Sequence, residues 1–473
     1  MDLDLGSTSL PPWILYPATV ALALVFLVLA FFRTRNPRAK VALVVPWFRY
    51  LMTFFHQVTF KAAVAGLSYM ALASSAMFVT GLLLVKRRHL LLKPAIPIYL
   101  MVAVVLASGA ANHVIGGTID ISIKFGYLLV IALLVYESLG EVGEQRMTRL
   151  LLWPFITPFT FLALSLLLGV KKASESDGSV SYIGGYSHES GFSMVLATCF
   201  LISCFATDLK RVLRNSIQFA CIAGILLANY RTTILGIVPL LLVVFNRELL
   251  TPFAPKQRRF LLIVTLVCSV LGVAVVAYLM RERFSDMAGA FEPWNRLLKR
   301  PEYYSIDDRA LFNGRAYIWS AYITGWVDGT TVNHLLGHGA NSWQGVFPIY
   351  AHNTLISTLY EYGPPGVLAM LLLWTWMLLL AAKARHGPKG TLIAAHLSFL
   401  IMNMATMPHW MIEGDILYGI LVGYTMHFSL RPAPGAAMSA PKSARRLAAL
   451  SVREPALVHQ LSREPSPKHP ARG

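Results

Sequence analysis

Charged residues are scarce in this chain of 473 residues, and acidic residues are the scarcest of them. Asp, Glu, Lys and Arg together make up 14% of the sequence, whereas 56% of the residues are hydrophobic. A soluble domain of this length needs roughly a quarter of its residues charged to cover its surface. The deficit argues against an ordinary soluble protein and indicates that most of the surface faces lipid.

Cysteine is rare as well, and its placement indicates neither a disulfide framework nor a metal site. All four cysteines fall inside apolar runs: Cys199, Cys204, Cys221 and Cys268. A thiol in such a run is usually a small buried apolar side chain. The sequence also lacks a glycine-rich phosphate loop ending in Lys-Ser or Lys-Thr, and it lacks paired zinc-type His/Glu spacing. We therefore expect no cofactor and no metal at a functional site.

Apolar runs of about 20 residues, the length that spans a bilayer, recur along the chain. We predict spans near residues 13–32, 41–59, 62–85, 94–111, 121–137, 150–170, 188–206, 214–229, 232–246, 260–280, 354–381, 391–408 and 414–430. The second run contains Pro46, Arg49 and His56, so a re-entrant or interfacial segment is its alternative. The predicted fold is all-α: a polytopic integral membrane protein with 12–13 transmembrane helices and a large outer loop.

The net charge of +18 raises the possibility of a nucleic-acid partner. The basic residues are instead scattered between apolar runs, which is the positive-inside distribution, so we expect no nucleic acid. With thirteen spans and the N-terminus outside, six basic connections fall on the cytoplasmic side: residues 33–40, 86–93, 146–149, 210–214, 247–259 and 383–389. Without the second span, residues 33–40 would lie outside, so the charge rule favours thirteen spans.

Two polar segments divide the chain into four regions. Residues 281–351 form an aromatic-rich outer loop between the N-terminal helices, residues 1–280, and the C-terminal helices, residues 352–430. Loops of this length are usually functional. The last region, residues 431–473, is rich in Pro, Ser, Ala and Arg, so we expect a disordered basic tail near the anionic cytoplasmic leaflet.

Two arginines fall on the side where basic residues are otherwise depleted. Arg231 lies between two runs too close together to leave a real loop; its alternative role is snorkelling to lipid headgroups. Arg315 lies in the first turn of a predicted interfacial helix whose N-cap would be Asn313. Free backbone N–H groups and a guanidinium at one helix end suit a bound anion such as phosphate. The alternative for Arg315 is a salt bridge to Asp307 or Asp308.

Further candidates follow along the outer loop and into the next run. His338 lies between two glycines, and His352 and Asn353 directly precede a predicted span. A histidine at that place can accept a proton, because its pKa lies near neutrality; a hydrogen bond at the interface is the alternative. Glu361 precedes a Tyr-Gly-Pro-Pro-Gly run that must break or kink the helix. A carboxylate at that depth is costly unless it lines a cavity or has a partner, so it marks a site or a packing hinge.

The order of these features resembles the O-antigen ligase and Wzy-type polysaccharide polymerase superfamily. The resemblance covers residues 230–370 and rests on Arg231 in a short outer loop and on four runs: GRAYIW at 314–319, GHG at 337–339, HNTL at 352–355 and EYG at 361–363. Residues 182–189 stand where related proteins often have a glycine-containing loop before a span. The short loop of the family commonly reads Ser-Arg, whereas this chain has Tyr230 before the arginine.

The resemblance implies a metal-independent, inverting glycosyltransferase facing the periplasm from the bacterial inner membrane. Its donor is a glycan on undecaprenyl pyrophosphate. Arg231 and Arg315 would hold the pyrophosphate, and His352 would accept or orient the proton of the attacking sugar hydroxyl. The further substrate-binding candidates are His338, Asn353 and Glu361. The implied partners are the lipid-linked donor and acceptor, the bilayer, and the flippase and chain-length regulator of the same pathway.

Three functions stay open from the sequence. The favoured one is a polymerase, which moves the growing chain onto a new lipid-linked repeat unit, and the closest rival is a ligase, which moves the finished glycan onto lipid A-core. A transporter or lipid-linked oligosaccharide flippase would place ionisable residues near the middle of several spans. The few candidates for that are His56, Lys124, His396 and Glu361. No internal repeat is apparent, which also weakens the transporter hypothesis.

Overall fold

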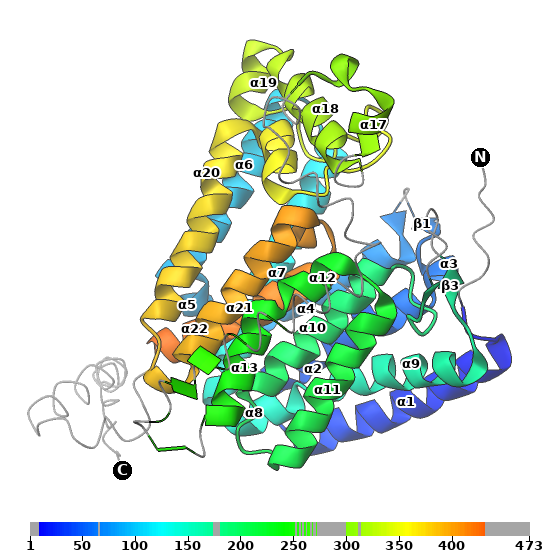
Figure 1. Ribbon diagram of the computed structural model, residues 1–473, viewed down its shortest axis with the longest axis vertical. Helices are drawn as coiled ribbons and strands as arrows, with labels where there is room; N and C mark the ends of the chain where they lie inside the picture. The colour runs from blue at the N-terminus through cyan, green and yellow to red at the C-terminus, as the bar shows by residue number, and fades with distance from the viewer. Residues whose placement is uncertain are drawn as a thin grey trace, which may run out of the picture.

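The computed structural model describes residues 9–64, 67–173, 180–250, 299–310 and 314–430, with scattered positions between 253 and 271. Across these residues the chain is mostly helical and has very little strand. The strands in the described ranges form two short antiparallel hairpins, which pair β1 (Ala62–Val64) with β2 (Leu67–Ser68) and β3 (Lys172–Ala173) with β4 (Val180–Ser181). The helices form an elongated bundle (Figure 1). The all-α prediction is therefore confirmed for this part of the chain.

The helices follow the chain in two groups on either side of residues 251–298. The first group holds α1 (Pro12–Arg33), α2 (Pro37–Phe54), α3 (His56–Thr59), α4 (Tyr69–Leu84), α5 (Arg87–Leu90), α6 (Ile96–Ala111), α7 (Ile115–Val142), α8 (Glu144–Leu150), α9 (Ile156–Leu168), α10 (Glu189–Phe205), α11 (Arg211–Ala228), α12 (Arg231–Gly236) and α13 (Val238–Leu250). The second holds α17 (Ile306–Ala310), α18 (Arg315–Val327), α19 (Thr331–Leu336), α20 (Thr354–Ala382), α21 (His386–Ala405) and α22 (Ile412–Leu430). Short 3₁₀ turns adjoin several of them: η1 (Lys93–Ala95), η2 (Trp153–Phe155), η4 (Pro301–Tyr303) and η5 (Pro408–Trp410).

Six helical segments in the described residues are long and apolar enough to cross a membrane. They are Pro12–Arg33, Lys93–Ala111, Ile115–Val142, Glu144–Leu168, Arg211–Ala228 and Thr354–Ala382. Three shorter apolar helices accompany them, namely Tyr69–Leu84, Glu189–Phe205 and Val238–Arg247. In a bilayer a helix satisfies its own backbone polar groups, so these lengths and compositions indicate a membrane-embedded protein. The predicted span at 260–280 lies almost entirely outside the described residues.

Several predicted spans have different limits in the structure, and three of them contain a strand, a turn or a break between helices. The run at 62–85 begins with the β1–β2 hairpin, so its helix starts only at Tyr69. The run at 150–170 contains the η2 turn around Pro154, and α9 begins after it. The run at 232–246 consists of two helices, α12 and α13, that meet at Ile237. Hydropathy measures polarity alone, so it does not separate a strand or a turn from a helix within an apolar run.

Helices α7 and α22 form the centre of the bundle. Residues 412–428 of α22 are buried throughout, as are residues 127–139 of α7. Gly419 and Gly423 lie on one face of α22, four residues apart, and allow the two backbones to approach closely. A Cβ on Gly419 would lie 2.9 Å from the carbonyl oxygen of Leu128, and a Cβ on Gly423 would lie 2.7 Å from that of Ala132. Any larger residue at either glycine would push the two central helices apart.

A buried ion pair joins α2 to this centre. Arg49 donates from Nε and Nη2 to the two carboxylate oxygens of Glu413 in α22, at 3.2 and 3.3 Å. The hydroxyls of Thr53 and Tyr186 donate to the same carboxylate, at 3.2 and 2.9 Å. A buried charge is tolerated when it is paired and hydrogen-bonded in this way. The pair accounts for the arginine in the second predicted span and holds α2 inside the bundle.

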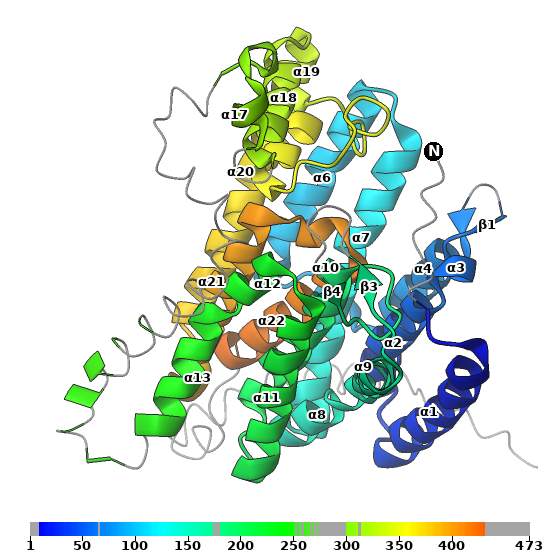
Figure 2. The same ribbon diagram turned by 45° about the vertical axis from the view of Figure 1, so that its right-hand side comes forward.

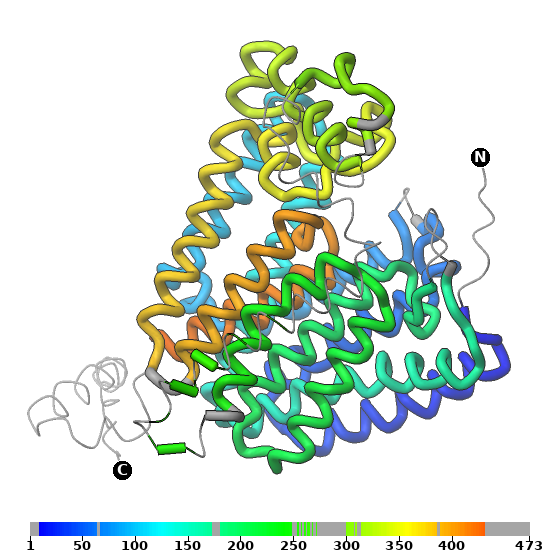
Figure 3. Tube along the Cα trace, in the orientation of Figure 1, coloured from blue at the N-terminus to red at the C-terminus, as the bar shows by residue number. Residues whose placement is uncertain are grey.

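Five of the predicted basic connections meet at one end of the bundle, which we call the basic end. Four of them make the contacts Arg38 Nε–Glu137 Oε2 (2.7 Å), Lys86 Nζ–Glu141 Oε1 (2.5 Å), Arg146 Nη2–Arg33 O (2.7 Å), Arg149 Nε–Asp208 Oδ2 (3.2 Å) and Arg385 Nη2–Glu144 Oε2 (2.9 Å). Leu213 of the fifth, residues 210–214, lines a pocket together with Arg33, Arg146 and Arg149. We call the opposite end, where α12, α18 and α20 begin, the loop end. The tube trace shows α20 running between the two ends beside α6 (Figure 3). In two views α17, α18 and α19 gather at the loop end (Figures 1 and 2).

Three of the four cysteines lie in the described residues, and all three are buried and free of disulfides. Cys199 and Cys204 belong to α10, and Cys221 belongs to α11. Burial of these thiols inside apolar helices is what the sequence predicted. Cys268 lies outside the described residues.

Candidate functional site

Arg315 and His352 are brought close to each other by the start of α18 and the segment before α20. Arg315 is the first residue of α18, and Trp319 lies one turn further along the same helix face. The indole Nε1 of Trp319 donates to the carbonyl of Ala351 at 2.9 Å. Because Ala351 is the residue before His352, this hydrogen bond fixes the first turn of α18 beside the histidine.

Arg231 and His352 are linked through the end of α21. Thr232, the neighbour of Arg231, donates to the carbonyl of Ala405 at 3.4 Å. Asn353, the neighbour of His352, donates to the carbonyl of Met404 at 3.1 Å. Met404 and Ala405 are successive residues, so both chain segments are anchored at the same turn of the helix. The beginnings of α12 and α20 therefore lie side by side at the loop end.

The charge of Arg315 lies close enough to Tyr230, Tyr350 and His352 to affect the pKa of all three. Burial raises the pKa of Tyr230 and of Tyr350, and the positive charge of Arg315 opposes both rises. Burial, as the largest cause, together with the charges of Arg315 and His188 lowers the pKa of His352 to about 4. Tyr230 directly precedes Arg231 in the chain. We call the group formed by Arg231, Arg315 and His352, with these neighbours, the loop-end cluster.

His352 has an unusual backbone and an unsatisfied ring nitrogen. Its φ of 54° lies in the left-handed region, which is costly for a residue with a side chain, and strained backbone of this kind clusters at functional sites. Its ring packs against Tyr350, with the two centroids 4.0 Å apart. Within the described part of the chain, its buried Nδ1 has no hydrogen-bond partner. At neutral pH the ring is uncharged, so His352 presents a nitrogen able to accept a proton.

The first turn of α18 differs from the prediction in its cap. The N-cap is Gly314, with φ of 79°, and not the residue before it. The predicted cap, Asn313, lies outside the described residues. Asp308, one of the two predicted salt-bridge partners of Arg315, pairs instead with Lys299. Within the described residues Arg315 forms no ion pair with a carboxylate, so its charge remains available to a ligand.

His188 and Glu189 belong to the cluster, although the sequence pointed to them only as part of the segment 182–189 and not as site residues. The Nδ1 of His188 accepts from the backbone N–H of Ser190 at 3.1 Å, and its ring lies 6.5 Å from that of Tyr230. Glu189, the first residue of α10, pairs with Lys172 at 3.1 Å. The available signal was a His-Glu pair directly before an apolar run, the same pattern that identified His352 and Asn353.

Asn353 acts as the N-cap of α20. Its side-chain oxygen accepts from the backbone N–H groups of Leu355 and Ile356, at 3.0 and 3.2 Å, and its amide donates to Met404. Both polar atoms are thus occupied by the protein itself. These contacts give Asn353 a structural task beside the substrate-binding role suggested by the resemblance.

We expect Asn353→Ala to weaken the fold more than the chemistry. Loss of an N-cap costs about 1 kcal/mol of stability, because the first helical N–H groups lose their acceptor. The unfolding temperature of the purified protein should fall, whereas glycan transfer per folded molecule should remain within a few-fold of the wild type. Asn353→Asp keeps the capping oxygen and serves as the matched control. A hundredfold loss of transfer without a change in unfolding temperature would instead make Asn353 a substrate-binding residue.

Glu361 holds the outer loop against α20. Its carboxylate accepts from the backbone N–H of Asn341 at 3.0 Å and from the hydroxyls of Ser357 and Tyr362, at 2.9 and 3.0 Å. The side chain is buried, and Gly363, with φ of 65°, makes the predicted kink in the helix. Of the two alternatives that the sequence left open for Glu361, these contacts favour the packing hinge.

His338 takes part in the same contact between loop and helix. Its ring stacks on that of Tyr360, with centroids 4.5 Å apart, and its Nε2 lies 3.1 Å from the carbonyl of Gly325. The preceding residue, Gly337, has φ of 70°, and a Cβ there would lie 2.3 Å from the backbone of Glu361. The glycine beside the histidine is thus required by the close approach of two backbone segments. These contacts show His338 packing the loop.

No family model matches this chain, and no curated protein matches it. A fold by itself does not define an activity, so the function has to be argued from the residues of the site.

Proposed function

We propose that this protein is a membrane glycosyltransferase that acts at the loop-end cluster. In this proposal it transfers a glycan from undecaprenyl pyrophosphate to a sugar hydroxyl of a lipid-linked repeat unit. The observation that carries the proposal is that the starts of α12 and α20 are both anchored at the end of α21 and the start of α18 is bonded to the residue before His352. The segments that carry Arg231 and Arg315 therefore meet beside an uncharged His352. Two guanidinium groups and a proton acceptor are what transfer from a diphosphate donor requires.

In this proposal the two arginines stabilise the negative charge that develops on the leaving pyrophosphate. As the acceptor hydroxyl oxygen bonds to the anomeric carbon, the bond from that carbon to the pyrophosphate oxygen breaks, with inversion at the carbon. The electron pair of that bond leaves with the pyrophosphate, whose negative charge rises in the transition state. Guanidinium groups form paired, charge-assisted hydrogen bonds with phosphate oxygens, so Arg231 and Arg315 would stabilise the leaving group.

His352 would take the proton of the acceptor hydroxyl. Because burial and the charge of Arg315 keep its pKa near 4, the ring is uncharged at neutral pH and ready to accept. Such a weak base accepts a proton efficiently only after the hydroxyl has become acidic by bonding to the anomeric carbon. We therefore expect proton transfer to accompany departure of the pyrophosphate and not to precede it.

The proposal includes a membrane orientation. We place the protein in the bacterial inner membrane as 12–13 spans, with the loop end towards the periplasm. Support comes from the five basic connections that meet at the basic end, because basic residues are retained on the cytoplasmic side. Helix α20 starts beside the cluster and ends next to the connection that contains Arg385. The cluster is thus at the end remote from those charges.

The ionisable residues inside the bundle give little support to a transport function. His396 forms a hydrogen bond with Thr425 at 2.9 Å, and Lys124 pairs with Asp120 at 2.8 Å. Arg49 is held by Glu413. Fixed partners of this kind stabilise one packing arrangement, whereas alternating access needs groups that exchange partners.

The distinction between polymerase and ligase can be tested by deleting the gene in the native host. We expect lipid-linked single repeat units to accumulate and long chains to disappear, because a polymerase consumes those units. Extracted lipid-linked glycans, resolved by chain length, give the measurement, and complementation with the wild-type gene is the control. Accumulation of long lipid-linked chains would support the ligase instead. An unchanged glycan profile in the deletion strain would contradict the transferase proposal altogether.

A further inference from the structure

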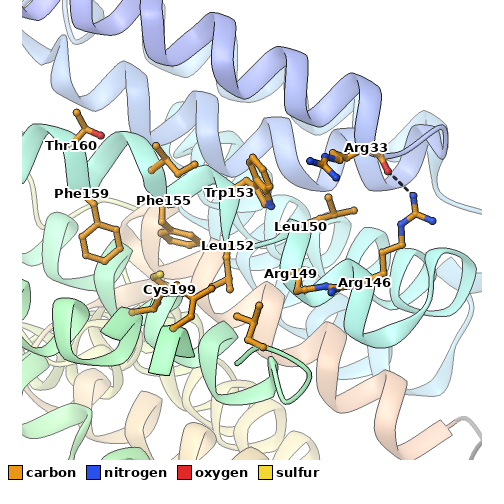
Figure 4. A pocket seen from close by; sticks show the side chains of 14 residues that line it. Arg33, Arg146, Arg149, Leu150, Leu152, Trp153, Phe155, Phe159, Thr160 and Cys199 are labelled. Atoms are coloured by element: carbon orange, nitrogen blue, oxygen red, sulfur yellow. Dashed lines mark hydrogen bonds between the residues drawn. The ribbon is translucent and has the colours of Figure 1, made fainter. Parts of the chain in front are cut away.

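A cavity of about 790 Å³ opens at the basic end, far along the helices from the loop-end cluster. Its walls come from the end of α1, from α8, the η2 turn and α9, and from α10 and α11. The volume lies within the range of roughly 300–1,000 Å³ that is typical of ligand pockets. Figure 4 shows Arg33, Arg146 and Arg149 together on one side and Phe159 and Thr160 on the other. The cavity is therefore charged at one side and largely apolar at the other.

The three arginines have a single carboxylate among them in the described residues. Arg149 pairs with Asp208, with Nε and Oδ2 3.2 Å apart. Arg146 donates from Nη2 to the backbone carbonyl of Arg33 at 2.7 Å, which satisfies one N–H but cancels no charge. Neither Arg33 nor Arg146 forms an ion pair within the described part of the chain. About two positive charges on exposed side chains thus line this side of the cavity without a carboxylate partner in the described residues, and a bound anion would reduce their repulsion.

The rest of the cavity wall is apolar. Trp153, Ile156 and Phe159 line it from the η2 turn and α9, and Leu213 and Ile217 line it from α11. Ile156 and Leu213 are 39% and 51% exposed, so this side of the bundle leaves apolar surface uncovered. Helix α11 lies in a segment apolar enough to cross a membrane, as does α9. An apolar chain lying in the cavity would cover that surface while remaining inside the bilayer.

We propose that this cavity binds a phospholipid with an anionic headgroup, its phosphate at the arginines and its chains along α9 and α11. A soluble anion would meet the charge but leave the apolar wall uncovered. A zwitterionic lipid would bring a positive ammonium group close to three arginines that have only one carboxylate partner, which is unfavourable. Basic pockets between helices on the cytoplasmic side are suited to anionic headgroups, and five basic connections lie at this end. The site is separate from glycan transfer and does not depend on it.

A bound lipid would also attach α1 to the bundle. In α1, only 17% of the most apolar 18-residue stretch is buried, the smallest share among the six membrane-crossing segments in the described residues. Arg33 is its last residue, whereas Arg146 and Arg149 belong to α8. A phosphate shared by these guanidinium groups would join the end of α1 to α8.

The test is lipid binding by the purified full-length protein, measured by native mass spectrometry. Phosphatidylglycerol and phosphatidylcholine with identical chains are added separately. We expect the wild type to retain phosphatidylglycerol in preference to phosphatidylcholine. The double variant Arg33→Gln/Arg146→Gln should bind phosphatidylglycerol about thirtyfold more weakly, because each basic residue near an anionic surface contributes roughly fivefold in affinity.

Two further variants separate a specific lipid site from its alternatives. Arg87→Gln/Arg88→Gln removes the same charge from exposed positions at the basic end outside the cavity, and it should leave binding unchanged. Thr160→Trp places a large side chain in the apolar part and should weaken lipid binding with all arginines intact. Equal binding of the two lipids, or equal losses in both double variants, would overturn the proposal. Displacement of the lipid by millimolar inorganic phosphate, together with unchanged binding in Thr160→Trp, would overturn it in favour of a simple anion site.

Discussion

Replacing Arg315 with alanine is expected to reduce glycan transfer by a hundredfold or more. The residue would stabilise charge that develops only as the pyrophosphate leaves, and removal of one such donor typically costs about 3 kcal/mol of transition-state stabilisation. The loss should appear in the rate of transfer more than in the affinity for the donor. Transfer measured with a lipid-linked donor in membranes, and chain length measured in cells, give two independent readouts.

Two further substitutions test whether the loss in Arg315→Ala comes from the guanidinium group at this position. Arg315→Lys keeps the positive charge but not the planar pair of N–H donors, so we expect an activity between those of alanine and the wild type. Arg300→Ala is the matched control, because Arg300 also lies in the outer loop and forms an exposed ion pair with Asp328. Exposed pairs contribute little to stability, so this variant should behave as the wild type. Normal chain lengths from Arg315→Ala at normal protein levels would refute the proposed site.

Replacing His352 with alanine is expected to lower the transfer rate by a factor of about 10² to 10⁴, the usual contribution of a general base. The variant should still bind the lipid-linked donor, because both arginines remain. His352→Gln offers a ring-sized polar group without a basic nitrogen and should be as slow as alanine. His334→Ala is the control, because His334 is an exposed histidine of the same loop, hydrogen-bonded to the carbonyl of Val327. Equal transfer rates for all these variants would remove His352 from the mechanism.

The pH dependence of the wild type follows from the lowered pKa of His352. Because the uncharged ring is the active form, transfer should be independent of this group from neutral pH down to about pH 5. It should then fall as the pH drops through about 4, whereas an ordinary histidine would cause that fall near 6.5. The folded state also disfavours protonation of this ring. The stability it contributes is therefore complete above about pH 6.5 and is lost as the pH falls towards 4.

The length of an apolar run is enough to predict where the longest helices lie. The runs at 13–32 and 354–381 are helices α1 and α20 within a residue or two at each end. This agreement has a physical basis, because the thickness of the hydrocarbon core sets the length of an apolar helix. Local signals also predicted the start of α18 to within a residue and the kink of α20 near Gly363. Each of these features depends on residues that are close together in the chain.

Contacts between residues far apart in the chain follow from how the helices pack. No local pattern pairs Arg49 with Glu413, which is 364 positions away, or brings His188 to His352. The sequence marked Asn353 and Glu361 only as polar residues near the start of a span. Their contacts show that Asn353 caps α20 and that Glu361 binds the outer loop to α20. The same holds for the charged cavity, because Arg33 and Arg146 meet only when α1 lies against α8. Hydropathy is a property of one segment, whereas burial, pairing and pKa depend on what other segments bring to the same place.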